Sequence, residues 1–329
     1  MGDWLIVSSC NGLIRALDKQ TGQVRWSYDI HQDGDQTEFH GDPLITEKLI
    51  VITTDGNMGH VYAFDRLSGA VRWKYPVQWR GLASDVVRSG ENIYALTLGD
   101  ELLCLDLDTG QVRWTFQSSA PRKSFFWASS PTLGGSHVFF GGLDGFVYAL
   151  DARTGKLAWK SDLGARVTTS VVSQGNDLYV GTANHHLYRI DAVSGKILAD
   201  LPVEAEPRWR LILTRDSLLA FLGPQILASF DLSLKGARWA AKASHNWTSA
   251  RPYVWHELVL AGDSNELIAF RVADGASLWN RQIPGTIRGI AVSDDVLYVG
   301  TLRGPLLAFG PIHAKLGCNP LGRLTRWSQ

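Results

Sequence analysis

Apolar and polar residues alternate along almost the whole chain, in short runs that are separated by turn residues. The segments 168–173, 177–182, 187–191 and 196–201 show this clearly, because each is rich in Val, Tyr, Leu or Thr and a turn-forming cluster follows it. No stretch of comparable length places apolar residues at the spacing of a helix face. The pattern therefore predicts four-stranded antiparallel meanders and almost no helix.

One phrase returns at intervals of roughly forty residues, which is the spacing of an array built from one supersecondary unit. Its first copy reads Leu17-Asp18-Lys19-Gln20-Thr21-Gly22-Gln23-Val24-Arg25-Trp26. Related copies are anchored at positions 65, 106, 151, 191, 231 and 271, and a last copy at 310 is incomplete. The copies at 191, 231 and 271 lack one or more of the characteristic residues of the phrase. Because the array has no linker, we expect one domain over 1–329.

The repeated phrase has a mechanical explanation. The aspartate can accept hydrogen bonds from backbone amides two residues on, and the glycine supplies the positive φ that the turn requires. Val24 and Trp26 then point to one face of the next strand, where a large ring can fill the space between sheets. The preceding strand, as in 61–64, is apolar on both faces, which indicates burial on both sides. Sheets that pack on copies of themselves predict a β-propeller.

These repeats resemble the PQQ-like, or quinoprotein-type, β-propeller family. Its signature of aliphatic-x-Ala-x-Asp-x-x-Thr-Gly-x-x-x-Trp is nearly complete at 13–26 and 147–159. The resemblance covers nearly the whole chain and implies an all-β propeller, and counting the repeats predicts eight blades. In size the chain is similar to the non-catalytic branch, exemplified by the lipoprotein of the bacterial β-barrel assembly machinery, which binds a partner. The family also contains dehydrogenases, so the fold alone does not give the function.

Counting strands leaves the closure of the propeller open. Eight middle strand pairs can be found but only seven innermost strands, because the chain begins directly on a second strand. Residues 311–329 are therefore the predicted closing segment, and Leu324-Thr325-Arg326-Trp327 resembles an outer strand. This segment could complete the last blade or reach the first.

Catalysis is not expected. The resemblance to quinoprotein dehydrogenases would imply pyrroloquinoline quinone bound over calcium, and many of those enzymes carry two adjacent cysteines beside the quinone. Cys10, Cys104 and Cys318 are far apart, and no haem-attachment motif is present. We therefore expect no cofactor and no catalytic residue. A divergent enzyme is the alternative, with its catalytic residues in the long connections at 28–39 and 116–127.

Composition and charge exclude some classes of binding partner. With 32 basic and 32 acidic residues the formal net charge is zero, which argues against a nucleic-acid track. The apolar runs are of strand length, so no membrane-spanning helix is expected.

No secretory signal precedes the first strand, which favours the cytoplasm, or the periplasm if a leader has been removed. The three cysteines are expected to be reduced and buried. No histidine spacing predicts a metal site.

Candidate binding residues gather in the loops between blades, which the propeller fold places at the mouth of its channel, on the face opposite the repeated turn. Tryptophans at the entry to inner strands and neighbouring arginines could bind a protein or acidic peptide, or an anionic or quinone-like small molecule. Alternatively, the tryptophans fill the channel and the arginines pair with blade carboxylates. The predicted residues are Glu38, His40, Trp79, Arg80, Trp127, Arg166, Arg208, Trp209, Arg210, Trp247 and Arg288.

Overall fold

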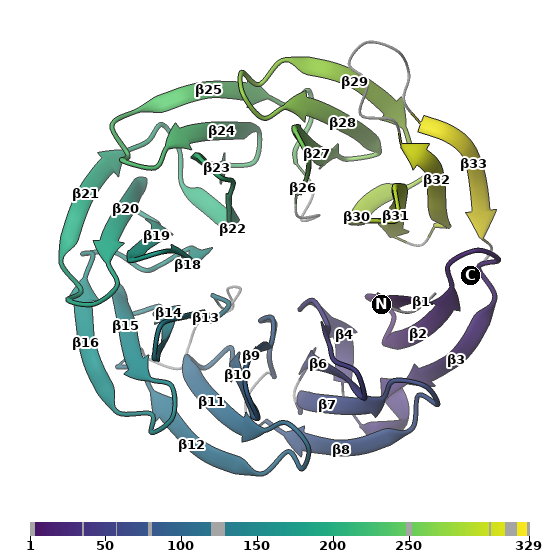
Figure 1. Cartoon of the computed structure of the whole chain (residues 1–329), viewed down its shortest axis with the longest axis horizontal. Coiled ribbons are helices and arrows are strands. Elements are labelled where there is room, and N and C mark those ends of the chain that lie inside the picture. The colour runs from purple at the N-terminus through teal and green to yellow at the C-terminus, as the bar shows by residue number, and fades with distance from the viewer. Residues whose placement is uncertain are drawn as a thin grey trace. The chain divides into compact units, whose positions relative to one another are not determined.

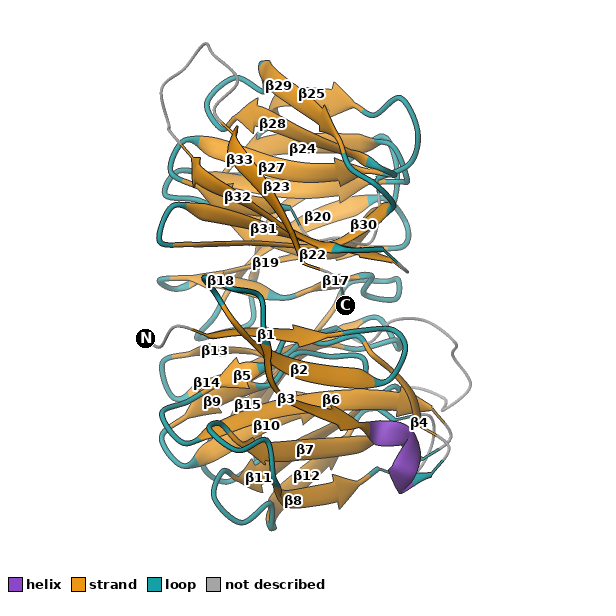
Figure 2. Ribbon diagram, turned by 90° about the vertical axis from the view of Figure 1, so that its right-hand side faces the viewer, coloured by secondary structure: helices purple, strands orange, loops and turns teal. Residues whose placement is uncertain are grey.

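The computed structural model describes residues 4–34, 36–56, 58–77, 81–119, 129–247, 252–302, 304–312 and 321–327, and nearly all of its regular structure is β-strand. Within these residues the helical content is the short 3-10 helix η1 (Ile30–Asp33), which lies beside β4 (Figure 2). None of the described segments forms a helix that is long and apolar enough to cross a membrane.

The chain divides into two compact units, Met1–Leu198 and Ala199–Gln329. The first unit contains antiparallel sheets that follow one another along the chain. Its strands are β1 (Trp4–Ser8), β2 (Leu13–Asp18), β3 (Val24–Asp29), β4 (Gln36–Phe39), β5 (Leu44–Ile45), β6 (Leu49–Gly56), β7 (His60–Asp65), β8 (Val71–Pro76), β9 (Val87–Ser89), β10 (Asn92–Leu96), β11 (Glu101–Asp106), β12 (Val112–Gln117), β13 (Thr132–Gly134), β14 (His137–Gly141), β15 (Phe146–Asp151), β16 (Leu157–Asp162), β17 (Thr169–Ser170), β18 (Val172–Gln174), β19 (Asp177–Thr182) and β20 (His186–Asp191). The boundary between the units falls inside β21 (Ile197–Pro202).

The second unit contains three sheets of the same kind. Its strands are β22 (Pro207–Leu213), β23 (Ser217–Leu222), β24 (Ile226–Asp231), β25 (Ala237–Lys242), β26 (Tyr253–Trp255), β27 (Leu258–Asp263), β28 (Glu266–Arg271), β29 (Ser277–Gln282), β30 (Thr286–Ser293), β31 (Val296–Leu302), β32 (Leu306–Ile312) and β33 (Leu321–Trp327). Within each sheet the strands lie side by side in chain order, as in β26-β27-β28-β29 (Figure 1). The fold class is an eight-bladed β-propeller, which confirms the prediction made from the repeat.

The first and last sheets show how the closing segment is used. The first sheet has three strands, β1-β2-β3, whereas β33 pairs with β32 as the fourth strand of the last sheet. In that pairing Leu324 lies opposite Phe309, and Leu321 lies opposite Ile312. The segment that resembles an outer strand therefore completes the last blade.

The two middle strands of each blade form the core. In β7, Val61 and Ala63 pack in one cluster with residues of the β9–β12 sheet, including Ile93. The alternate residues Tyr62 and Phe64 pack in another cluster, with residues of the β1–β3 sheet. All four β7 side chains are fully buried. A strand that is apolar on both faces thus packs against a sheet on each side, as the period of two requires.

Candidate functional site

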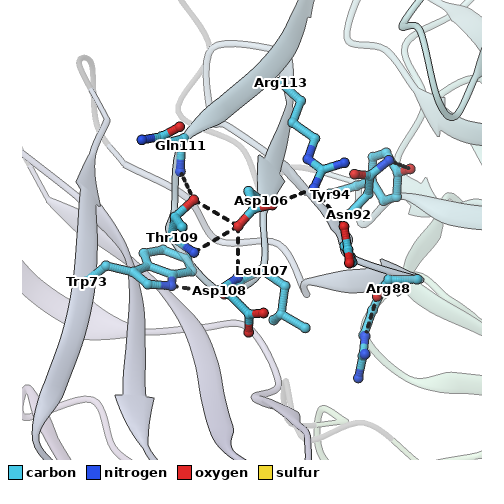
Figure 3. A network of polar contacts seen from close by, with 12 residues as sticks. Trp73, Arg88, Asn92, Tyr94, Asp106, Leu107, Asp108, Thr109, Gln111 and Arg113 are labelled. Carbon is cyan, nitrogen blue, oxygen red and sulfur yellow. Dashed lines mark hydrogen bonds and ion pairs between the residues drawn. The ribbon is translucent and has the colours of Figure 1, made fainter.

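The repeated turn is a hydrogen-bonded cap, as Figure 3 shows for Asp106. Its Oδ1 accepts hydrogen bonds from the backbone N of Asp108 at 3.1 Å and of Thr109 at 2.9 Å, and from the Thr109 hydroxyl at 2.8 Å. Its Oδ2 forms an ion pair with Arg113. Gly110 closes the turn with φ at 70°. These contacts stabilise the carboxylate, and the Arg113 and Thr109 hydrogen bonds lower the pKa of Asp106 to about 2.

The turn holds the tryptophan of the preceding blade. The Trp73 indole Nε1 donates to the Leu107 carbonyl at 2.9 Å, and a β-carbon on Gly110 would stand 2.6 Å from the Trp73 ring. We call this arrangement the tryptophan clamp: a motif tryptophan donates to the residue after the aspartate position of the next repeat and packs on the glycine of that turn. The same clamp joins Trp26 to Arg66 and Gly69, Trp114 to Ala152 and Gly155, Trp159 to Ala192 and Gly195, and Trp239 to Val272 and Gly275. The repeated phrase is therefore a structural joint between blades.

The clamp depends on the tryptophan of one repeat and the glycine of the next, and it still forms at Arg271, where the aspartate is missing. Trp26 and Trp239 are buried, and the other four motif tryptophans are half-buried, so none of the six is exposed. Trp279 Nε1 is buried and has no acceptor among the described residues, and the repeat at 310 carries neither the aspartate nor the glycine of the phrase. The fifth repeat has Ala199 in place of the tryptophan, and the sixth has Lys235 in place of the glycine.

Three of the predicted mouth residues, Trp79, Arg80 and Trp127, lie outside the described residues, as does most of the connection at 116–127. The other long connection, at 28–39, is anchored on Asp33. That carboxylate accepts hydrogen bonds from Tyr28 Oη at 2.5 Å and Tyr62 Oη at 2.9 Å, and it pairs with Lys74 at 2.6 Å. These contacts hold the connection against the second sheet.

Glu38 and His40 lie together in the first unit. Glu38 belongs to β4 and His40 follows that strand, and His40 Nε2 is 3.1 Å from Glu38 Oε2. The second ring nitrogen, Nδ1, is 2.7 Å from Asp55 Oδ2, in β6. His40 therefore bridges two carboxylates. The turn at Cys10, half-buried rather than buried as expected, brings a thiol to the same place.

Arg208, Trp209 and Arg210 lie on one irregular stretch of β22. The pairing of β22 with β23 shifts register between Arg208 and Ile212, and Trp209 has φ at 62°. We call this stretch the β22 bulge (208–211). The Trp209 ring meets Phe221 edge to face at 5.3 Å between ring centres, which fixes it against the core. Arg208 is exposed and pairs with Glu206 at 3.1 Å.

The remaining predicted residues have different surroundings. Trp247 is buried between Phe221 and Phe270, so its prediction as a binding residue is corrected: it is a core residue. Arg288 is exposed at a register shift of β30, and Arg166 is half-buried after β16. The predicted residues belong to both units, so their convergence at one mouth stays a prediction.

Sequence reasoning missed the buried acids Asp85, Asp100 and Asp263, and Asp100 has a strongly shifted pKa. Asp100, at φ 59° in the turn between β10 and β11, accepts hydrogen bonds from the Leu143 backbone N at 2.6 Å and Ser118 Oγ at 3.1 Å. Burial raises its pKa to about 6 in spite of these hydrogen bonds, and the charge of Asp144 adds to the effect. The sequence signal was weak, since one loop aspartate resembles many others.

Comparison with known proteins decides the family. The family model described as "Outer membrane protein assembly factor BamB" matches residues 1–127 and 124–312. The chain belongs to this family. The match to its Legionella pneumophila member is 27% identical and covers 57% of this chain but only 48% of that protein. The match to the Burkholderia pseudomallei member is 23% identical and covers 94% of this chain and 83% of that protein.

Solved structures support the same fold. The crystal structure of BamB from Moraxella catarrhalis superposes with a TM-score of 0.77 at 18% identity, and covers 92% of both chains. The computationally designed Ika8 protein gives the same TM-score at 14% identity. A quinohemoprotein alcohol dehydrogenase of Pseudomonas putida is similar over 22% of this chain and 11% of its own length, at 38% identity.

Proposed function

We propose that this chain is a non-catalytic propeller scaffold that binds a protein partner during assembly of outer-membrane proteins, and that the β22 bulge is part of its binding surface. The observation that carries the proposal is the family match over nearly the whole chain. The relatives are outer-membrane protein assembly factors, which indicates the process, and the propeller supplies a rigid support for loops. No cofactor, quinone or catalytic residue takes part in the proposed role.

The geometry of the β22 bulge favours it as a contact surface. Trp209 is held in a left-handed backbone conformation that non-glycine residues rarely adopt, and such conformations gather at functional sites. The exposed ion pair of Arg208 with Glu206 contributes little to stability, so an acidic side chain of a partner can compete for the guanidinium. Tryptophan and arginine are also the residues most enriched at interface hot spots.

We place this function in the periplasm rather than the cytoplasm, because the names of the relatives refer to outer-membrane assembly. Fractionation of the native host tests this location. A small carboxylated ligand is the competing occupant of the bulge.

The binding surface is tested by photo-crosslinking in the native host. A photoreactive residue at position 208 is expected to give one discrete adduct with another protein, whereas the same residue at the exposed position 153, in a repeated turn, gives none. Arg208→Glu is then expected to weaken the purified pair at least tenfold, while Arg153→Glu leaves it unchanged. Equal adducts at both positions, or displacement of the partner by small carboxylates alone, would overturn the proposal.

A further inference from the structure

Three side chains that can bind a transition metal meet beside the first and second sheets. Cys10 lies in the turn between β1 and β2, Glu38 in β4, and His40 directly after it. One ligand atom from each, a sulfur, an oxygen and a nitrogen, lies within 4.8 Å of the other two. Metal–ligand bonds of about 2.0–2.3 Å place the ligands of one tetrahedral ion roughly 3–4 Å apart, so small side-chain movements suffice to close the site.

The surroundings of His40 call for a cation. A carboxylate oxygen faces each ring nitrogen: Asp55 lies 2.7 Å from Nδ1 and Glu38 lies 3.1 Å from Nε2. An imidazole with one proton can satisfy only one of them. If Nδ1 donates to Asp55, the lone pair of Nε2 faces the Glu38 carboxylate, so the two groups are placed to bind one cation between them. A carboxylate behind the imidazole is also the usual support of a metal-binding histidine.

We propose that Cys10, Glu38 and His40 bind a zinc ion, with Asp55 as the residue that orients His40. The mixture of thiolate, imidazole and carboxylate suits Zn²⁺, whereas calcium and magnesium prefer oxygen ligands alone. The His40 side chain is 20% exposed and that of Glu38 is 39% exposed, so an ion can enter from solvent and water can supply the fourth ligand. The site goes beyond the scaffold function and reverses the expectation from sequence that no metal binds.

The ion would join two blades. Cys10 comes from the first sheet, whereas Glu38 and Asp55 come from β4 and β6 of the second. Metal binding therefore adds a link at the same pair of blades that the Trp26 clamp connects, on loops that the clamp does not reach.

The test is a zinc titration of the chelator-treated full chain against a coloured competitor. We expect one ion per chain, with affinity reduced roughly 100-fold or more in Cys10→Ser and His40→Asn, and about 10- to 100-fold in Asp55→Asn. Cys104→Ser and His245→Asn are the matched controls: Cys104 is buried in β11, His245 lies in the second unit, and both variants should bind like the unaltered protein.

Cobalt supplies an independent reading. The Co²⁺-loaded protein is expected to show a thiolate-to-cobalt charge-transfer band that Cys10→Ser abolishes and Cys104→Ser retains. Thermal melts of the metal-free variants show whether each variant is folded. If Cys10→Ser does not fold, the zinc titration is repeated with Glu38→Gln instead. The proposal would be overturned if the unaltered protein bound zinc no more tightly than the Cys10→Ser/His40→Asn double variant does. A Co²⁺ spectrum of the unaltered protein without the charge-transfer band would overturn it as well. Neither result bears on crosslinking at position 208.

Discussion

Gly110 lies against the indole ring of Trp73, so close that a β-carbon on Gly110 would stand 2.6 Å from ring carbons. The glycine thus serves two purposes: its φ of 70° closes the turn of one blade, and its missing side chain admits the tryptophan of the blade before. The second purpose explains why glycine and tryptophan recur together in the phrase.

Gly110→Ala should therefore lower the free energy of unfolding by more than the unfavourable positive φ alone would lower it. Gly135 is the matched control, because its φ is 57° and a β-carbon added there would meet no heavy atom within 4 Å. Alanine costs about 1–2 kcal/mol at either position for its backbone conformation. We expect Gly110→Ala to lose about 1–3 kcal/mol more, because it also displaces the Trp73 ring. Urea unfolding measures both variants, and equal losses would show that the ring contact is not stabilising.

The hydrogen bond of the clamp can be isolated by replacing tryptophan with phenylalanine. Trp73 donates to Leu107, whereas Trp279 has no acceptor among the described residues. Both rings are half-buried, so the loss of packing is comparable. Trp73→Phe should lower the free energy of unfolding by about 1 kcal/mol more than Trp279→Phe does. A larger loss at Trp279 would contradict the assignment of the hydrogen bond.

Asp106 should stabilise the fold only where its carboxylate is charged. Its pKa is lowered to about 2, so its contribution is fully present above about pH 4 and is lost as the pH falls through about 2. Asp106→Asn is thus expected to be less stable than the unaltered protein at pH 7, and the gap should narrow toward pH 2. Asp108→Asn, at an exposed position of the same turn, is the control and should show no gap.

Asp100 should have the opposite pH dependence. Its pKa is raised to about 6, so between about pH 4 and pH 6 the unfolded chain ionises this group before the folded protein does. The unaltered protein therefore loses stability relative to Asp100→Asn as the pH rises through this window, by on the order of 3 kcal/mol. Asparagine tolerates the positive φ and keeps an acceptor. Thermal melts at pH 4 and pH 8 check the difference; a constant gap would argue against the raised pKa.

The features that could be predicted from the sequence are those that residues close together along the chain determine. The Asp106 turn, the alternation in β7 and the eight blades all follow from local spacing repeated along the chain. The acceptor of Trp73, in the next blade, depends on how two sheets stack, and no local pattern names it. The same holds for Cys10 and His40, which meet only because two loops lie at one joint. Trp247 was assigned to a loop by its position, but Phe221 and Phe270 enclose it.

The missing clamp between the fifth and sixth repeats has a consequence for how the protein melts. Ala199 cannot supply an indole and Lys235 cannot supply a bare glycine face, and the chain divides into its two compact units at Leu198. In a repeat protein, cooperativity is transmitted through the contacts of each repeat with the next. Calorimetry should therefore resolve two unfolding transitions, one for each compact unit, and a single melting temperature would not describe this chain.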